Sequence, residues 1–120
     1  MLLGSNIIIY SFQSQFDFLQ KLIKNKDTSC SAITQVETLG YYQISKDEKF
    51  YMEECFNAIT VLPVTDTIIN TATFLRQQKN ISLGDAIIAA TALEFQQTLV
   101  TRNVIDFEWV EGLKILNPFE

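Results

Sequence analysis

The segment Leu83–Leu93 most constrains how this chain can fold, because it is apolar almost all round a predicted helix and yet carries Asp85 near its start. A helix of this kind is normally buried on most of its faces. A buried carboxylate is costly unless hydrogen-bond donors or a cation meet it. Backbone N–H groups of the helix's own first turn could serve, as could a metal ion shared with other acids. A second acid, Asp106, follows the predicted strand 98–101 and favours the metal.

Short, β-branched segments alternate with helical patterns along the whole chain, and this alternation predicts the fold class. Strands are expected at residues 1–3, 28–30, 59–64, 98–101 and 113–116. Helices are expected over 7–23, 31–42, 45–58, from 66 to the polar break at 77–80, and over 83–93, with Asn6, Ser31 and Asp66 as N-caps. The pattern predicts a three-layer α/β/α sandwich with a mostly parallel sheet of four or five strands. At 120 residues we expect one domain, spanning residues 1–120.

The chain contains no histidine, which narrows the chemistry open to it. Serine and cysteine hydrolase triads and most zinc sites depend on imidazole. Catalysis would therefore rest on carboxylates, hydroxyls or a metal. Cys30 and Cys55 are too few and too far apart for a zinc site or a CxxC pair, so we expect reduced, packed thiols.

The net charge and the hydropathy of the sequence limit the partners and the location that we expect. The sequence has no apolar run of about 20 residues for a membrane span and no secretory leader at its start, so the cytoplasm is the expected location. A net charge of −5 does not favour non-specific nucleic-acid binding but suits a basic protein partner. RNA contacts would need a local patch, for which the candidates are Lys21, Lys24, Lys26, Arg76, Lys79 and Arg102.

Polar residues follow several of the predicted strands. In an open parallel sheet, functional groups gather beyond the carboxyl ends of the strands. Gly4 and Ser5 follow the first strand, Glu37 lies on the helix after the second, Asp85 begins a helix, and 103–106 follows the fourth strand. Carboxylates held close together repel one another unless a divalent cation neutralises them. Oxygen ligands without imidazole favour Mg²⁺ or Mn²⁺.

Several segments in order along the chain resemble PIN domains (PilT N-terminus domains), and the nearest branch resembles the VapC toxins of bacterial toxin–antitoxin pairs. The matching segments are Leu3–Tyr10, Ser31–Thr34 with Glu37, Ser82–Ala92, Leu99–Phe107 and Gly112–Pro118. The resemblance implies a parallel sheet flanked by helices, and metal-dependent RNA cleavage that leaves a 5′-phosphate and a 3′-hydroxyl. It also implies a homodimer and a cognate antitoxin, a small DNA-binding protein whose basic segment occupies the acidic site.

The family's site is an acidic quartet, which the resemblance carries over only in part. Glu37 and Asp85 fall on the second and third acids, and the fourth maps onto the turn of Asn103 and Asp106. The first acid is an Asp in the family, and that position is Gly4 here. We therefore expect weak Mg²⁺ binding and slow or absent RNA cleavage. Either the substitution is inactivating, arising by selection or design because an active toxin kills its expression host, or this is a natural degenerate member kept for binding. We favour the former, because the residues around Gly4 still look like those of an intact active member.

Other readings stay open for several of these residues. Asp85 can act as a first-turn helix residue, Glu37 as a solvated one and Asp106 as the start of a turn. Asn6 is a helix cap or a substrate contact, and Ser5 and Thr101 hold water or satisfy backbone groups. Arg102 is the candidate for steadying a phosphate, or it pairs with Asp106 or Glu108. The alternative function is a non-catalytic protein or RNA interaction module on the same scaffold. A phosphoacceptor receiver domain ranks low, because it needs an acid pair after the first strand.

Overall fold

A computed structural model describes residues 1–120 as a five-stranded, all-parallel sheet between two layers of helices. The strands are β1 (Leu2–Leu3), β2 (Ser29–Ser31), β3 (Thr60–Leu62), β4 (Leu99–Val100) and β5 (Ile115–Leu116), in the order β3-β2-β1-β4-β5. The helices are α1 (Ser5–Ser11), the 3₁₀ helix η1 (Ser14–Leu19), α2 (Gln20–Lys24), α3 (Ala32–Leu39), α4 (Lys46–Ala58), α5 (Asp66–Gln78), α6 (Leu83–Glu94) and α7 (Val104–Phe107). The predicted fold class is confirmed, with five strands.

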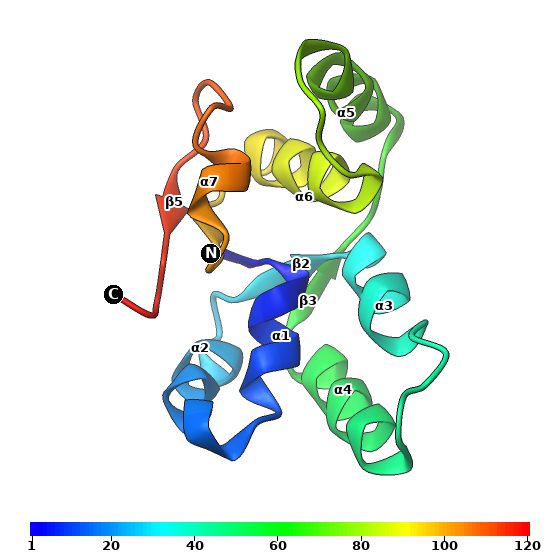
Figure 1. Cartoon of the computed structure of the whole chain (residues 1–120), viewed down its shortest axis with the longest axis vertical. Coiled ribbons are helices and arrows are strands. Elements are labelled where there is room, and N and C mark those ends of the chain that lie inside the picture. Colours follow the sequence, from blue (N-terminus) through cyan, green and yellow to red (C-terminus); the bar gives the residue numbers. More distant parts are fainter.

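Alternate side chains of the central strands point to opposite faces of the sheet, and each face has its own apolar core. Leu3 and Val100 pack with residues of α1, α2 and α4. Leu2 and Leu99 pack with residues of α5, α6 and α7. Figure 1 shows the same division, with α5 and α6 on one side of the sheet and α1, α2 and α4 on the other. Strands β1 and β4 have only two residues each, and helices cover both faces of the sheet, so both strands are fully buried.

The helix expected over residues 7–23 is interrupted in the structure. It ends at Ser11 and resumes as η1 and α2, with Phe16 in a non-helical conformation (φ −113°, ψ 34°) inside η1. The apolar spacing across the break still points Leu19 and Ile23 into the core, so periodicity alone did not reveal it. The break brings the ring of Phe16 beside that of Phe119, near the chain's C-terminus.

Two of the expected N-caps also differ. The N-cap position of α1 is Gly4, not Asn6, which leaves the Asn6 side chain free to reach Thr101. The side chain that caps α5 is Thr65, with Asp66 following in the first turn. Ser31 caps α3 as expected. None of the helices is both long and apolar enough to cross a membrane.

Candidate functional site

A cavity of about 240 Å³ lies where the carboxyl ends of β1 and β4 meet α1, α3 and α6. We call it the acidic cavity. Its polar lining residues are Ser5, Asn6, Glu37, Asp85, Thr101 and Asn103, and Gly4 forms part of its wall. Because β1 and β4 are adjacent parallel strands, their carboxyl ends bring residues about 100 positions apart in sequence into one place.

Glu37 is held at the cavity by two neighbouring helices. The Ser5 hydroxyl lies 2.7 Å from Glu37 Oε1, to which it donates, and 3.0 Å from Thr34 Oγ1. Gly84 in α6 provides the space for the carboxylate, since a Cβ at that position would collide with Glu37 Oε2 and lie 2.7 Å from Glu37 Cδ. The absence of a side chain at Gly84 therefore lets Glu37 approach the first turn of α6.

Asp85 is half-buried in that same first turn. Burial raises the pKa of its carboxyl group above the usual 3.8. A hydrogen bond from Ser82 opposes this rise in pKa, while repulsion from Glu37 and Asp106 adds to it. The Ser82 hydroxyl oxygen also accepts the backbone N–H of Asp85 at 3.2 Å, which caps the helix. The negative charge of Asp85 is thus under-compensated by the protein alone.

Asn6 and Thr101 join α1 to the end of β4. Asn6 Nδ2 donates to Thr101 Oγ1 at 3.3 Å, and the backbone N–H of Asn103 donates to the same oxygen at 3.1 Å. Asn6 Oδ1 is buried and has no hydrogen-bond donor. A buried acceptor without a donor is unusual in a folded protein. At the edge of an acidic cavity, such an oxygen suits a cation.

Gly4 has an ordinary extended backbone (φ −68°, ψ 156°), so its conformation does not require glycine. A Cβ built there would lie 3.6 Å from Asn6 Oδ1 and 3.7 Å from Thr101 Cβ, at the wall of the acidic cavity. Its 3.3 Å approach to the Val100 carbonyl oxygen is tight and calls for a small backbone adjustment. An aspartate at this position would add a carboxylate to the cavity.

The remaining predicted site residues lie elsewhere. Asp106 lines a neighbouring cavity, which shares Asp85 with the acidic cavity. Of the two candidates for the fourth acid, only Asn103 lines the acidic cavity itself. Arg102 points away, with its guanidinium carbon 4.2 Å from the ring centroid of Phe119 and 5.0 Å from that of Tyr10.

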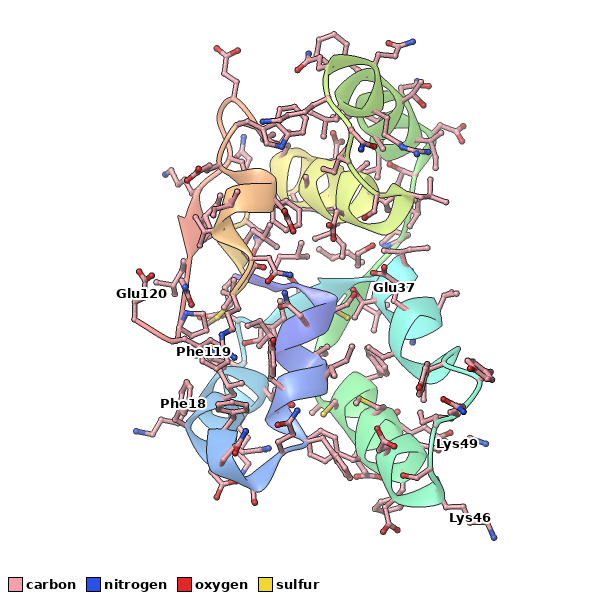
Figure 2. All side chains as sticks on the ribbon, viewed as in Figure 1. Phe18, Glu37, Lys46, Lys49, Phe119 and Glu120 are labelled. Atoms are coloured by element: carbon pink, nitrogen blue, oxygen red, sulfur yellow. The ribbon has the colours of Figure 1, made fainter.

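Arg102 belongs to what we call the aromatic clamp, formed by Arg102 with Tyr10, Phe16 and Phe119. The third ring, Phe16, has its centroid 5.7 Å from the guanidinium, and the rings also meet edge to face. Figure 2 shows Phe119 beside Phe18, well separated from Glu37. The expected phosphate contact for Arg102 is therefore replaced by cation–π packing in this structure.

The donors around the acidic cavity fit a hard divalent cation in type but not in number. All are oxygens, as Mg²⁺ and Mn²⁺ prefer. No three acids lie close enough together to hold an ion. Two residues that line the cavity, Gly4 and Asn103, carry no carboxylate. The residues therefore fit a weakened metal site.

Sequence reasoning missed the part played by Gly84. Glycine inside a helical pattern lowers helix stability and usually has a packing reason. Here the reason is the carboxylate of Glu37, which only the tertiary structure places opposite. The capping role of Ser82 was also not predicted, although a serine three residues before Asp85 carries a recognisable N-cap signal.

The fold and the site define a small parallel α/β/α sandwich with carboxylates around a cavity at its strand ends. The PIN domain family model matches residues 1–111, so the chain belongs to the PIN domain family. No curated protein matches the chain. The sequence-based recognition of a PIN domain is confirmed.

Several solved structures share the fold over nearly their whole length. A toxin–antitoxin complex from Klebsiella pneumoniae is 27% identical, with a TM-score of 0.80 and coverage of 99% of this chain and 98% of that chain. VapBC2 from Rickettsia felis, bound to a promoter DNA fragment, is 23% identical (TM-score 0.80; 97% and 96% covered). FitAcB from Neisseria gonorrhoeae is 24% identical (TM-score 0.77; 99% and 98% covered). These similarities show that the chain shares the fold of these proteins.

Proposed function

We propose that this chain is the toxin of a VapBC-type toxin–antitoxin pair, a Mg²⁺-dependent endoribonuclease impaired by glycine at position 4. The observation that carries the proposal is the meeting of Glu37, Asp85 and Asn103 in one cavity whose wall includes Gly4. These are the positions onto which the family's acidic quartet falls. The scaffold supports a nuclease site, and the missing first acid explains why this form would cut RNA poorly.

Asp85 and Glu37 would hold the ion, with Asn6 Oδ1 and Asn103 as neutral oxygen ligands. A bound Mg²⁺ or Mn²⁺ supplies charge neutralisation at the phosphate and lowers the pKa of water. The chain's own residues prepare the cavity. Ser5 fixes Glu37, and Thr101 orients the Asn6 amide so that its oxygen stays available. Asp106 acts from the adjacent cavity by raising the pKa of Asp85.

The proposed partners follow from the same comparisons. The similar structures from Klebsiella pneumoniae and Rickettsia felis are toxin–antitoxin complexes, which supports a cognate antitoxin here. The net charge of −5 suits an antitoxin with a basic segment. We extend the proposal to a homodimer acting on RNA in the cytoplasm.

The proposal is tested by Gly4→Asp, which adds a third carboxylate, beside those of Glu37 and Asp85, at the cavity wall. We expect Mg²⁺-dependent cleavage of RNA at least about 100-fold faster than for the chain with glycine, a typical effect of completing one electrostatic contact to a transition state. Cleavage is followed on a fluorescent RNA, with EDTA as the metal-free control.

Gly4→Asn is the matched control, because it fills nearly the same space without the charge. Glu37→Gln combined with Gly4→Asp should return cleavage to the level of the chain as it stands. A folded Gly4→Asp protein that binds Mn²⁺ and leaves RNA intact would refute the nuclease assignment.

A non-catalytic interaction module is the second candidate. Glycine at position 4 and the lack of any three grouped acids favour it. Isothermal titration with Mn²⁺ separates the two functions. A nuclease site should bind Mn²⁺ at least about tenfold more tightly after Gly4→Asp, because affinity rises with ligand charge, whereas an interaction module should show no change.

A further inference from the structure

A second cavity, of about 340 Å³, shares Asp85 with the acidic cavity and has a different character. We call it the Trp109 cavity. Its wall includes Trp109, Lys79, Ile105 and Asp106. The volume is near the lower end of the range for small-molecule sites, about 300–1,000 Å³, so it admits a group of nucleotide size. The proposed cleavage chemistry gives no role to Trp109, Lys79 or Ile105.

The indole ring of Trp109 is held in a fixed orientation. Its Nε1 donates to the backbone oxygen of Asp106 at 2.8 Å. The ring is half-buried and packs against two of the apolar cores. Since Trp109 also lines the cavity, it presents a rigid aromatic surface there. Rigid aromatic surfaces of this kind are the platforms on which unpaired bases stack.

Lys79 brings a positive charge to the same platform. Its ammonium nitrogen lies over the Trp109 ring, 5.6 Å from the ring centroid. A base that stacks on this ring takes the place of the ammonium group, which then lies beside the base. In an acidic protein, a cation beside two carboxylates of the cavity wall offsets their repulsion of a phosphate. Ile105 adds an apolar side chain that is 79% exposed near the cavity. An aromatic ring, an apolar neighbour and a cation together form the set that binds single-stranded nucleic acid.

We propose that the Trp109 cavity binds one unpaired RNA base, stacked on Trp109 with its phosphate near Lys79, next to the phosphate to be cut. The inference rests on the proposed function, because Asp85 is common to both cavities and places the base beside the acidic cavity. The RNA must be unpaired at this particular nucleotide, since a paired base cannot enter the cavity.

The experiment uses the chain as it stands in Ca²⁺, which neutralises the carboxylates, with oligoadenylate as the probe. Trp109 is the only tryptophan, so its fluorescence reports on this cavity alone. We expect saturable quenching by oligoadenylate, and little quenching by the adenylate–uridylate duplex or by an abasic strand with the same phosphates. Absence of quenching, or equal quenching by the duplex or the abasic strand, would overturn the proposal.

Variants then show how much each side chain of the Trp109 cavity contributes to binding. Their affinity for labelled oligoadenylate is measured by fluorescence anisotropy. Trp109→Leu should weaken binding roughly 5- to 150-fold, the usual effect of losing one stacked base, and Trp109→Phe less. Because Trp109→Leu also removes packing, Lys79→Ala serves as a second variant at an exposed residue and should weaken binding several-fold. Lys49→Ala is the matched control at an exposed lysine of α4, a helix that contributes no residue to the Trp109 cavity, and it should change nothing.

Combination with Gly4→Asp distinguishes the two proposals. If Gly4→Asp cleaves RNA and adding Trp109→Leu raises KM while kcat holds, both stand. If KM is unchanged, the base site is wrong and the nuclease remains. If oligoadenylate quenches Trp109 while Gly4→Asp is inert, the base site stands and the nuclease is wrong.

Discussion

Thr101 and Arg102 are neighbours in the chain, yet they lie in two regions that differ in how well their charged and polar groups are compensated. Thr101 lines the acidic cavity, where Asp85 is under-compensated and Asn6 Oδ1 lacks a donor. Arg102 sits in the aromatic clamp, where three rings surround its charge. The cavity holds groups that the folded protein alone does not satisfy, while the clamp holds groups that satisfy one another.

This difference indicates that the aromatic clamp stabilises the fold, whereas the acidic cavity lowers stability and holds the candidate functional site. Like charges near one another and an orphaned acceptor destabilise the folded state until a ligand meets them. The clamp ties α1, η1 and the C-terminal residues together without any role in the cavity. Substitutions in the two regions should therefore have opposite effects on stability and activity.

Of the substitutions that compare the two regions, Gly84→Ala carries the largest expected change in free energy. The new Cβ would displace the Glu37 carboxylate, so we expect cleavage in the Gly4→Asp background to fall about tenfold, roughly 1.4 kcal/mol. The backbone at Gly84 is helical and does not require glycine. The folded state should therefore gain stability, up to about 0.5–1 kcal/mol. Kinetics and urea unfolding on the same protein measure both effects.

Glu37→Asp added to Gly84→Ala supplies the control, because the shorter acid leaves room for the Cβ. Partial recovery of cleavage is expected. If Gly84→Ala lowers stability and leaves the rate unchanged, the contact with Glu37 has no functional meaning.

Arg102→Ala should show the reverse pattern. Losing the cation–π contacts should lower the free energy of unfolding by about 1 kcal/mol, with cleavage in the Gly4→Asp background changed less than about twofold. Arg102→Lys should retain part of the stability, since the charge persists while the planar stacking is lost. Chemical denaturation gives the first quantity and a cleavage assay the second. A large loss of cleavage with unchanged stability would instead return Arg102 to the phosphate-binding role that the sequence suggested.

Asp85→Asn should give the smallest effect on folding stability, and the presence of that effect depends on pH. Because the pKa of Asp85 is raised on folding, the folded chain binds its proton more tightly than the unfolded chain. Stability is therefore lost as pH rises from 3.8 through the raised pKa, and the loss persists at neutral pH. Asp85→Asn should stabilise the protein at pH 7, by at most about 1 kcal/mol, and not below pH 3.8.

Asp66→Asn is the comparison for Asp85, since Asp66 also lies in the first turn of a helix but is exposed. It should slightly destabilise the protein by removing a favourable charge at a helix N-terminus. The same sign for both substitutions at pH 7 would mean that Asp85 is an ordinary first-turn acid.

Most of the fold was accessible from sequence because local signals agreed with the tertiary structure. The alternation of short strands and helices predicted the parallel sandwich, and Ser31 and Ser45 mark the starts of α3 and α4. The break after Ser11 was not accessible, because apolar residues keep helical spacing across it. The cap of α1 was misassigned because the Asn6 side chain has a tertiary partner, Thr101.

The candidate site was predictable in its residue types but not in its geometry. Glu37 and Asp85 could be chosen from their places after strands, and the structure places both in one cavity. Sequence could not decide between Asn103 and Asp106, because both belong to the same short segment at α7. The path of α7 places Asp106 in the Trp109 cavity instead of the acidic cavity. The sequence could not distinguish a phosphate-binding role for Arg102 from a packing role. Its contact with Phe119 depends on the path of the C-terminal residues, which only the tertiary structure shows.

The contact between Gly84 and Glu37 also links the evolution of two helices. Glu37 on α3 holds its carboxylate in the space that a Cβ at position 84 on α6 would need, so the two positions should vary together among homologous chains. Lineages with alanine or serine on α6 should carry aspartate on α3. The pair would then act as a single inherited unit, and a change at either position alone would be selected against.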